Sequence, residues 1–341
     1  MINEAIEILS GGKDLTAAQM GAVMEEIMTG KADTAQIVLF LTALAKKGET
    51  VEELTAAVTV MRLHATKINI CKQVILDTCG TGGDTKGTFN ISTTVAFVVS
   101  GCGIAVAKHG NRSVSSSCGS ADILEYLGVN INMLPEQIEE CLEYAGIAFL
   151  FAQGLHPAMK YAMPARKQIG KRTMFNILGP LSNPAGATHQ LVGVYDKRWI
   201  EPLANVLRNL GIVHALVVHG ADGLDEITTT ASTFIAESYR DVIKTYEIKP
   251  EDFGFKRSAL SDLQGGDAQL NSRILLDILS GKDGFKRDIV VLNAAAAIYA
   301  ADKVSSINDG IILAEKSIDS KKALEKLILL KDFSNRKFPK K

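Results

Sequence analysis

The sequence predicts an α/β protein in two unlike parts: a small all-helical N-terminal domain and a larger α/β domain with a mainly parallel, mixed central sheet. The chain has 341 residues, enough for about two domains of ~100–200 residues each. Residues 1–66 place apolar side chains at three- and four-residue spacing, which is typical of helices. From about residue 72, short β-branched runs alternate with helical patterns, as in the crossover units of a parallel sheet.

The first part contains helical patterns at 4–9, 16–28, 33–48 and 50–65. Thr50 followed by Glu53 is a capping-box pattern, and Gly30 and Gly48 stand where helices should end. The stretch 37–45 is apolar on more than one face, so we expect another subunit to cover some of this surface. We place the two domains at 1–66 and 67–341.

The second part begins with a strand pattern and then alternates. Strands are expected at 74–78, 104–108, 147–152, 190–195 and 214–220. Helical patterns lie between them at 91–101, 121–128, 135–146 and 199–211. The segment 227–260 has period two, which indicates an antiparallel excursion, and helices return from 268.

Composition excludes several classes of protein. The chain is 47% hydrophobic and 22% charged with a net charge of −1, so nothing draws it as a whole to nucleic acid or an anionic membrane. Its five cysteines show no CxxC spacing, which disfavours a disulfide framework or a zinc site and favours a reducing cytoplasm. The uncharged stretch 87–107 could span a bilayer by length, but its polar residues favour a buried helix and strand.

A glycine-rich stretch follows the first predicted strand: "DTCGTGGDTKGTFNIS", residues 77–92. Glycine lets a ligand approach the backbone, and the N–H groups of a turn that opens a helix are suited to phosphate. Neither GxxxxGK[ST] nor GxGxxG is present. A tight connection without a ligand stays open as the alternative.

A second polar loop follows the next strand: "KHGNRSVSSSCGSAD", residues 108–122. It combines basic side chains with an asparagine and serines. Because the carboxyl ends of parallel strands share one edge of a sheet, both loops should meet there. Together they would hold a ligand with more than one phosphate.

An acidic loop, "DGLDEIT" at 222–228, follows the strand at 214–220. Carboxylates beside a phosphate site indicate Mg²⁺, which prefers oxygen ligands and often shares them with phosphates. A solvated turn is the alternative, since Asp and Gly favour turns.

Cysteine and histidine side chains offer other chemistry. Cys79 and Cys118 beside His109 suggest a Cys–His nucleophile, but packing of small residues is the preferred interpretation. His214 and His219 flank a strand without metal-site spacing.

These stretches, with "NILGPLSNPA" at 176–185, closely resemble the anthranilate phosphoribosyltransferase family of tryptophan biosynthesis, along the whole chain. The resemblance implies a pentosyltransferase that moves the phosphoribosyl group of phosphoribosyl pyrophosphate (PRPP) to the amine of anthranilate. The products would be N-(5-phosphoribosyl)anthranilate and pyrophosphate. It also implies Mg²⁺, with two ions per subunit, and no nucleophile on the protein.

The resemblance implies these site residues. The residues expected to bind PRPP are Gly80, Gly82, Gly83, Asp84, Thr88, Asn90, Ile91, Ser92, Thr93, Lys108, His109, Gly110, Asn111, Arg112, Ser113, Val114, Ser115, Ser116 and Ser120. The residues expected to bind anthranilate are Gly80, Asn111 and Arg166, and the metal ligands are Ser92, Asp225 and Glu226. Lys108 would stabilise the departing charge.

The family's fold places the site in the cleft between the two domains, with part of about 165–190 joining the helical domain. It further implies a cytoplasmic homodimer formed through that domain, with neither nucleic acid nor membrane as a partner.

Two other functions are compatible with this architecture. A pyrimidine nucleoside phosphorylase shares the fold and a "KHG" loop, and some relatives of the fold are thought to bind nucleic acid without catalysis. The continuation "NRSVSS" and the Asp225–Glu226 pair favour PRPP.

Overall fold

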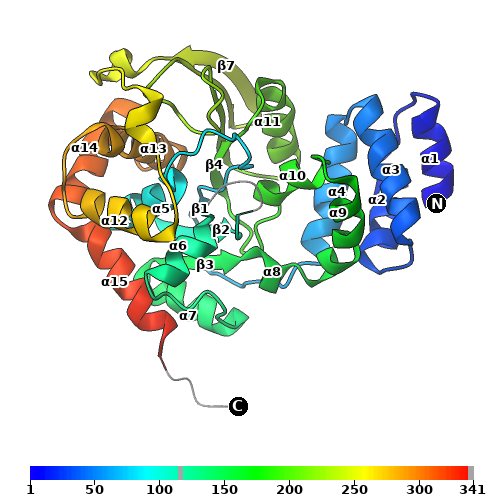
Figure 1. Ribbon diagram of the computed structural model, residues 1–341, viewed down its shortest axis with the longest axis horizontal. Coiled ribbons are helices and arrows are strands. Elements are labelled where there is room, and N and C mark those ends of the chain that lie inside the picture. The colour runs from blue at the N-terminus through cyan, green and yellow to red at the C-terminus, as the bar shows by residue number, and fades with distance from the viewer. Residues whose placement is uncertain (114–117, 337–341) are drawn as a thin grey trace.

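The computed structural model describes residues 1–113 and 118–336. Helices α1–α4 lie at one end of the molecule, and a seven-stranded sheet with helices around it forms the rest (Figure 1). The expected fold class is therefore confirmed. The predicted ligand residues Val114, Ser115 and Ser116 lie outside the described residues.

The N-terminal helices begin and end where capping chemistry places them. They are α1 (Ile2–Ser10), α2 (Ala17–Met28), α3 (Thr34–Lys47) and α4 (Val51–Leu63). The expected capping box is formed: the Glu53 N–H donates to Thr50 Oγ1 over 3.2 Å, and the Thr50 N–H donates to Glu53 Oε2 over 2.8 Å. Gly48, with φ of 94°, follows α3 directly and ends it.

The sheet is parallel on one side and antiparallel on the other. Its strands are β1 (Ile75–Asp77), β2 (Ala105–Gly110), β3 (Ile147–Phe151), β4 (His189–Gly193), β5 (His214–Gly220), β6 (Thr233–Tyr239) and β7 (Val242–Ile248). Their order is β3-β2-β1-β4-β5-β6-β7, and only the pairings of β5 with β6 and of β6 with β7 are antiparallel. The antiparallel excursion predicted at 227–260 is thus confirmed.

The strand order reverses between β1 and β4. From β1 the chain builds outward through β2 and β3, and from β4 it builds the other way through β5. The connections after β1 and β4 therefore leave in opposite directions. In open α/β sheets, ligands bind at the carboxyl ends of the strands at such a switch point, and the glycine-rich stretch follows β1 at this point.

Helices bury both faces of the sheet. Those of the α/β part are α5 (Ile91–Gly101), α6 (Ser120–Tyr126), α7 (Pro135–Ala145), α8 (Ala152–Leu155), α11 (Ile200–Asn209), α12 (Ala268–Leu279), α13 (Phe285–Ala300), α14 (Ile307–Asp319) and α15 (Lys322–Ser334). Along β5, Leu216 and Val218 join one buried cluster and Ala215 and Val217 join the other. Because both faces are covered, residues 215–218 of this strand form an unbroken apolar run.

The N-terminal helices share their core with part of the sheet. Their buried side chains belong to the cluster that also holds Leu203 of α11, Val192 of β4 and Val217 of β5. A returning segment completes this packing: η1 (Pro157–Tyr161), α9 (Met163–Ile169) and α10 (Phe175–Leu178) contact α2, α3 and α4 respectively. The helical end and the sheet are therefore joined by continuous apolar contact.

The uncharged stretch 87–107 is a buried helix, α5, followed by strand β2. Within residues 1–113 and 118–336, no helix has the length and apolar character required to cross a membrane.

Glu53 is a fully buried charged residue that joins three N-terminal elements. It accepts hydrogen bonds from the Leu15 N–H over 2.9 Å and from Lys47 Nζ over 2.7 Å, besides its capping bond to Thr50. The Lys47 side chain is only 6% exposed, and Glu53 is 0% exposed. Removing one partner of such a pair leaves a buried charge uncompensated.

We expect Glu53→Gln to lower the free energy of unfolding by about 3 kcal/mol, the low end for a broken buried pair because Asp14 still contacts Lys47. The matched control is Glu52→Gln on the same turn. The Glu52 carboxylate is exposed and accepts the Ala17 N–H, so this substitution should lower the free energy of unfolding by less than about 1 kcal/mol. Thermal and urea unfolding measure both. Equal losses in the two variants would contradict the role of burial.

Candidate active site

The glycine-rich stretch packs against the loops that follow β4 and β5. A Cβ on Gly80 would lie 3.0 Å from Asp225 Oδ2, and one on Gly193 would lie 1.6 Å from the Asp225 carbonyl oxygen. Gly82 and Gly83 have φ of 64° and 79°, a region that favours glycine. Gly80 and Gly193 therefore allow the loops to approach closely. Gly82 and Gly83 allow the turn that directs the Gly82 N–H toward Asp225.

Two backbone N–H groups of the glycine-rich stretch face the acidic pair. The Gly82 N–H donates to Asp225 Oδ2 over 2.7 Å, and the Ser92 N–H at the start of α5 donates to Glu226 Oε1 over 3.1 Å. The structure therefore brings together two segments 134 residues apart in the chain. Asn293 of α13 fixes the acidic loop from below: its side chain accepts the Ile227 N–H at 2.9 Å and donates to the Ile227 carbonyl at 2.7 Å.

The ionised forms of the acidic pair, Asp225 and Glu226, are disfavoured in the metal-free protein. Burial, followed by the charge of Asp84, raises the pKa of Asp225 to about 7, and burial, followed by Asp225, raises the pKa of Glu226 well above its usual value. Burial also raises the pKa of Asp84, whose Oδ1 accepts the Lys86 N–H over 3.1 Å. Asp225 and Glu226 are nonetheless half-buried and keep some exposure. Three crowded carboxylates with an open side suit a divalent cation with oxygen ligands, and so fit Mg²⁺.

Lys108 lies beneath these loops on β2. Its side chain is buried, and Nζ donates to the Thr78 carbonyl over 3.1 Å. Its charge offsets that of Glu226 and of Asp77. The sheet therefore holds a fixed cation close to the glycine-rich stretch, where a departing anion would be stabilised.

Asp77 joins the ends of β1 and β2 to the loop that contains Asn183. Its Oδ1 accepts the His109 N–H over 3.1 Å, and its Oδ2 accepts from Asn183 Nδ2 over 2.7 Å, which also donates to the Ala107 carbonyl over 2.9 Å. Burial raises the pKa of Asp77 to about 6, against the lowering effect of Lys108. This network positions the two ligand loops relative to each other.

In the second polar loop, the described residues are held mainly by one another. Ser120 Oγ donates to the Asn111 carbonyl over 3.2 Å, and Gln153 Nε2 donates to Asn111 Oδ1 over 3.1 Å. Arg112 pairs with Asp122 at 2.9 Å and with Glu125 at 2.8 Å, so its guanidinium is engaged on the loop's own helix. A Cβ on Gly110 would lie 2.2 Å from Ser120 Oγ, which explains a glycine there.

The end of the glycine-rich stretch is anchored rather than open. Asn90 donates to the Cys118 carbonyl over 3.1 Å and accepts from Asn271 Nδ2 over 2.9 Å. Thr88 forms an isolated antiparallel bridge with Gln264. Ile91 and Thr93 have buried side chains, so their backbone is the part suited to a ligand.

Arg166 lies on α9, apart from the phosphate loops. Its guanidinium carbon stands 5.7 Å from the centre of the Phe175 ring, and Nη1 lies 3.8 Å from Met163 Sδ. Burial lowers the pKa of Arg166. Among the described residues it forms no ion pair, so it can accept a carboxylate from a ligand.

Several residues of this site were not singled out from the sequence. They are Asn183, Gly193, Asn293 and Arg172. Arg172 lies 3.8 Å above the Tyr195 ring and donates to the Gly83 carbonyl, so the segment after α9 reaches the glycine-rich stretch. Of these four, only Asn183 could have been found from the sequence, because it lies within the stretch "NILGPLSNPA" that carries the resemblance. A single Gly, Asn or Arg outside a motif gives no indication of a site.

The Cys–His nucleophile receives no support. Burial raises the pKa of Cys79 to about 12 and that of Cys118 to about 11, and burial lowers the pKa of His109 to about 3. A neutral thiol beside an imidazole that resists protonation is a poor nucleophilic pair. His214 instead contacts Glu237 and Asp302 at 3.1 and 2.7 Å, and His219 Nδ1 lies 2.7 Å from the Val194 carbonyl, both structural positions.

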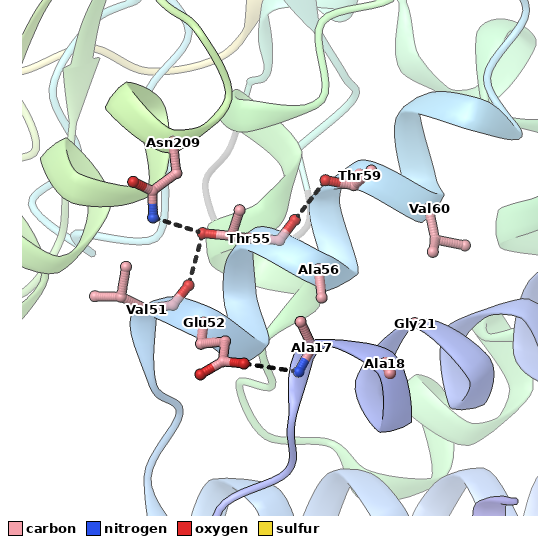
Figure 2. Close-up of a pocket in the computed structure, with 10 residues that line it drawn as sticks. All are labelled: Ala17, Ala18, Gly21, Val51, Glu52, Thr55, Ala56, Thr59, Val60 and Asn209. Atoms are coloured by element: carbon pink, nitrogen blue, oxygen red, sulfur yellow. Dashed lines mark hydrogen bonds between the residues drawn. The ribbon is translucent and has the colours of Figure 1, made fainter.

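A separate groove of about 680 Å³ lies between α2, α4 and the end of α11 (Figure 2). Its lining residues are Ala17, Ala18, Gly21, Val51, Glu52, Thr55, Ala56, Thr59, Val60 and Asn209. Figure 2 shows its polar side chains bonded within the wall, with Glu52 on the Ala17 N–H and Asn209 on Thr55. It shares no residue with the acidic pair, Asp225 and Glu226, or with the glycine-rich stretch.

Comparison with known families assigns the class of protein to which this helical bundle and switch-point site belong, a glycosyl transferase. Residues 3–65 match the helical bundle domain of a glycosyl transferase family, and residues 72–324 match the a/b domain of that family.

Similarity to individual proteins narrows the class. The chain is 53% identical to the anthranilate phosphoribosyltransferase of Pelobacter propionicus, covering 96% of this chain and 97% of that protein. It is 51% identical to that of Symbiobacterium thermophilum, with 95% of each chain covered. The chain belongs to the anthranilate phosphoribosyltransferase family.

Solved structures of anthranilate phosphoribosyltransferases match the fold of this chain. The crystal structure of the Thermus thermophilus enzyme matches with a TM-score of 0.93 and 38% identity, covering 97% of this chain and 99% of that one. The Saccharomyces cerevisiae enzyme, solved in complex with PRPP and Mg, matches with a TM-score of 0.89 and 28% identity, covering 98% and 97%. The yeast enzyme has also been solved in complex with 4-fluoroanthranilate.

We expect Asp225→Asn to stabilise the Mg²⁺-free protein at high pH, because Asn keeps an acceptor for the Gly82 N–H and removes a disfavoured charge. The folded pKa of about 7 exceeds the unfolded value of about 3.9. The folded form therefore binds more protons between these values, and wild-type stability falls as pH rises through them. The gain should reach about 1–3 kcal/mol above pH ~7 and vanish below pH ~4.

Thermal unfolding between these pH limits, with Mg²⁺ chelated, measures this gain. Asp241→Asn, in the exposed turn after β6, is the control and should change nothing. A gain for Asp225→Asn that does not depend on pH would contradict the assigned charge.

Proposed function

We propose that this protein transfers the phosphoribosyl group of PRPP to the amine of anthranilate, with release of pyrophosphate. The observation that carries the proposal is the contact of the glycine-rich stretch with the acidic pair through the Gly82 and Ser92 N–H groups. A diphosphate needs donors and a cation at one place, and this edge of the sheet offers both. The identity of the chain to anthranilate phosphoribosyltransferases supports the choice of substrates.

The assignment of roles follows the chemistry of each side chain. Asp225, Glu226 and Ser92 would hold Mg²⁺, with two ions per subunit. When bound, Mg²⁺ neutralises charge on the pyrophosphate oxygens. The backbone of Gly80, Gly82 and Gly83 would face the pyrophosphate, and the second polar loop, from Lys108 to Ser120, would complete the phosphate pocket.

The reaction needs no protein nucleophile. The amine nitrogen attacks the anomeric carbon, a C–N bond forms, and the C–O bond to pyrophosphate breaks with its electron pair leaving on oxygen. The amine then releases its extra proton. Lys108 and the N–H donors act on the charge of the leaving group, and one well-placed donor of this kind contributes about 3–4 kcal/mol of barrier lowering.

A homodimer formed through the helical end is part of the proposal. Leu39 of α3 is 57% exposed and Met163 of α9 is 50% exposed, and these two helices pack against each other. Large apolar side chains on adjoining helices suit a contact with a second copy. Sedimentation of the full chain measures the mass, and a monomer at micromolar concentration would contradict this part.

The test is the loss of anthranilate fluorescence when PRPP and Mg²⁺ are added to the purified chain. We expect turnover only with both, and none after chelation of the metal. Release of thymine from thymidine and phosphate, with no use of PRPP, would instead indicate a nucleoside phosphorylase. Retention on single-stranded DNA at physiological salt without turnover would indicate a nucleic-acid-binding relative.

Arg166→Ala should raise the KM for anthranilate roughly 10- to 100-fold, as expected for a lost charged hydrogen bond of about 1.5–3 kcal/mol. The kcat should change much less, because this contact holds substrate and transition state alike. The neighbouring Lys167→Ala, an exposed side chain on the same helix, is the control and should leave KM unchanged. Equal losses in kcat and kcat/KM would contradict a binding role.

A further inference from the structure

Asp77, Cys79 and His109 form a compact group where the start of the glycine-rich stretch meets the end of β2. Asp77 ends β1, Cys79 follows two residues later, and His109 lies on the adjoining parallel strand β2. One ligand atom from each, a carboxylate oxygen, a sulfur and a ring nitrogen, lies within 4.8 Å of the other two. None of the assigned Mg²⁺ ligands belongs to this group.

His109 is the independent sign that this group lacks a ligand. Its side chain is 3% exposed, yet neither ring nitrogen makes a well-formed hydrogen bond to the described residues. The Gly179 backbone approaches the ring and acts to raise the pKa of His109, but no hydrogen bond of normal geometry joins them. Buried polar atoms without a partner are uncommon and cost free energy, whereas a metal ion would use the ring's lone pair.

The donor set suits a zinc-type ion rather than Mg²⁺. Sulfur, imidazole nitrogen and carboxylate oxygen are the usual ligands of Zn²⁺, while Mg²⁺ takes oxygen. Zinc–ligand bonds of about 2.0–2.3 Å imply ligand separations of roughly 3.3–3.8 Å, so closing this group needs about 1 Å of movement. Cys79 can supply it, because it lies beyond the end of β1 and keeps some exposure.

We propose that Asp77, Cys79 and His109 bind a divalent cation of the zinc class, and that the bound ion inhibits the enzyme. On binding, the Cys79 S–H bond breaks, its proton goes to solvent, and sulfur bonds to the metal without any change of oxidation state. A water molecule completes the coordination. The ion enters from the Cys79 side, since Asp77 and His109 are buried.

Inhibition follows from the position of Cys79. Its neighbour Gly80 packs against Asp225, where even an added Cβ would lie 3.0 Å from Oδ2. Drawing Cys79 toward His109 moves Gly80 and the turn that presents the Gly82 N–H. This consequence rests on the proposed function, whereas binding of the ion does not.

Binding is tested on the full chain with Co²⁺ as the probe. Excess Mg²⁺ is present to occupy the acidic pair, Asp225 and Glu226, and a phosphine reductant keeps the cysteines reduced. We expect one Co²⁺ per chain with a near-ultraviolet thiolate-to-cobalt absorption band. Cys79→Ser should lose the band, and Cys71→Ser, which removes an exposed cysteine, should keep it. No band in the wild type, or a band that survives Cys79→Ser in a folded protein, overturns the site.

Inhibition is tested by titrating Zn²⁺ into the PRPP and anthranilate assay at saturating Mg²⁺. Cys79→Ser should require at least tenfold more Zn²⁺ for half-inhibition than the wild type and Cys71→Ser. Equal sensitivity of all three overturns the inhibitory role. If the chain shows no transferase turnover, the proposed function fails, but the cobalt band still decides the site.

Discussion

Uncompensated negative charge at the carboxyl edge of the sheet is the constraint on which this site depends. Asp84, Asp225 and Glu226 are crowded and partly desolvated, and each has a raised pKa. Isolated ions in such a place would be expelled or neutralised. The chain tolerates them because two backbone N–H groups and Lys108 oppose the charge in part. Under the proposed function, a bound cation and its phosphate ligand would offset the charge that remains.

The fold supplies that arrangement through strand order. Because the strand order reverses between the parallel neighbours β1 and β4, the glycine-rich stretch after β1 lies beside the loops that follow β4 and β5. Asn183 and Asn293 then hold these loops with buried side-chain amides. Glycine at 193 is the geometric condition for the contact, since a Cβ there would lie 1.6 Å from the Asp225 carbonyl oxygen, and at Gly80 an added Cβ would be tight, at 3.0 Å from Asp225 Oδ2.

The sequence was sufficient for the fold class, the N-terminal helices and the antiparallel strands, because these depend on local periodicity and capping. Thr50 and Glu53 predicted a helix start that the structure confirms. The glycine-rich and acidic stretches were recognisable by composition, and the resemblance assigned their roles. The side-chain contacts between segments could not be predicted from the sequence. Arg112 pairs with Asp122, and Asn293 bonds to a loop 66 residues away. Such pairings depend on tertiary placement, which one chain does not encode in any short pattern.

The buried cluster that runs from the N-terminal helices through α11 to β4 and β5 has an evolutionary consequence. The helical bundle cannot be exchanged as an independent module. Its inner side chains pack against the sheet, so a transplanted bundle would expose the apolar surface that this packing buries. Substitutions on loops and outward helix faces leave this shared core intact. If Arg166 binds the acceptor as proposed, a new acceptor would require substitutions near that residue rather than the exchange of a whole bundle.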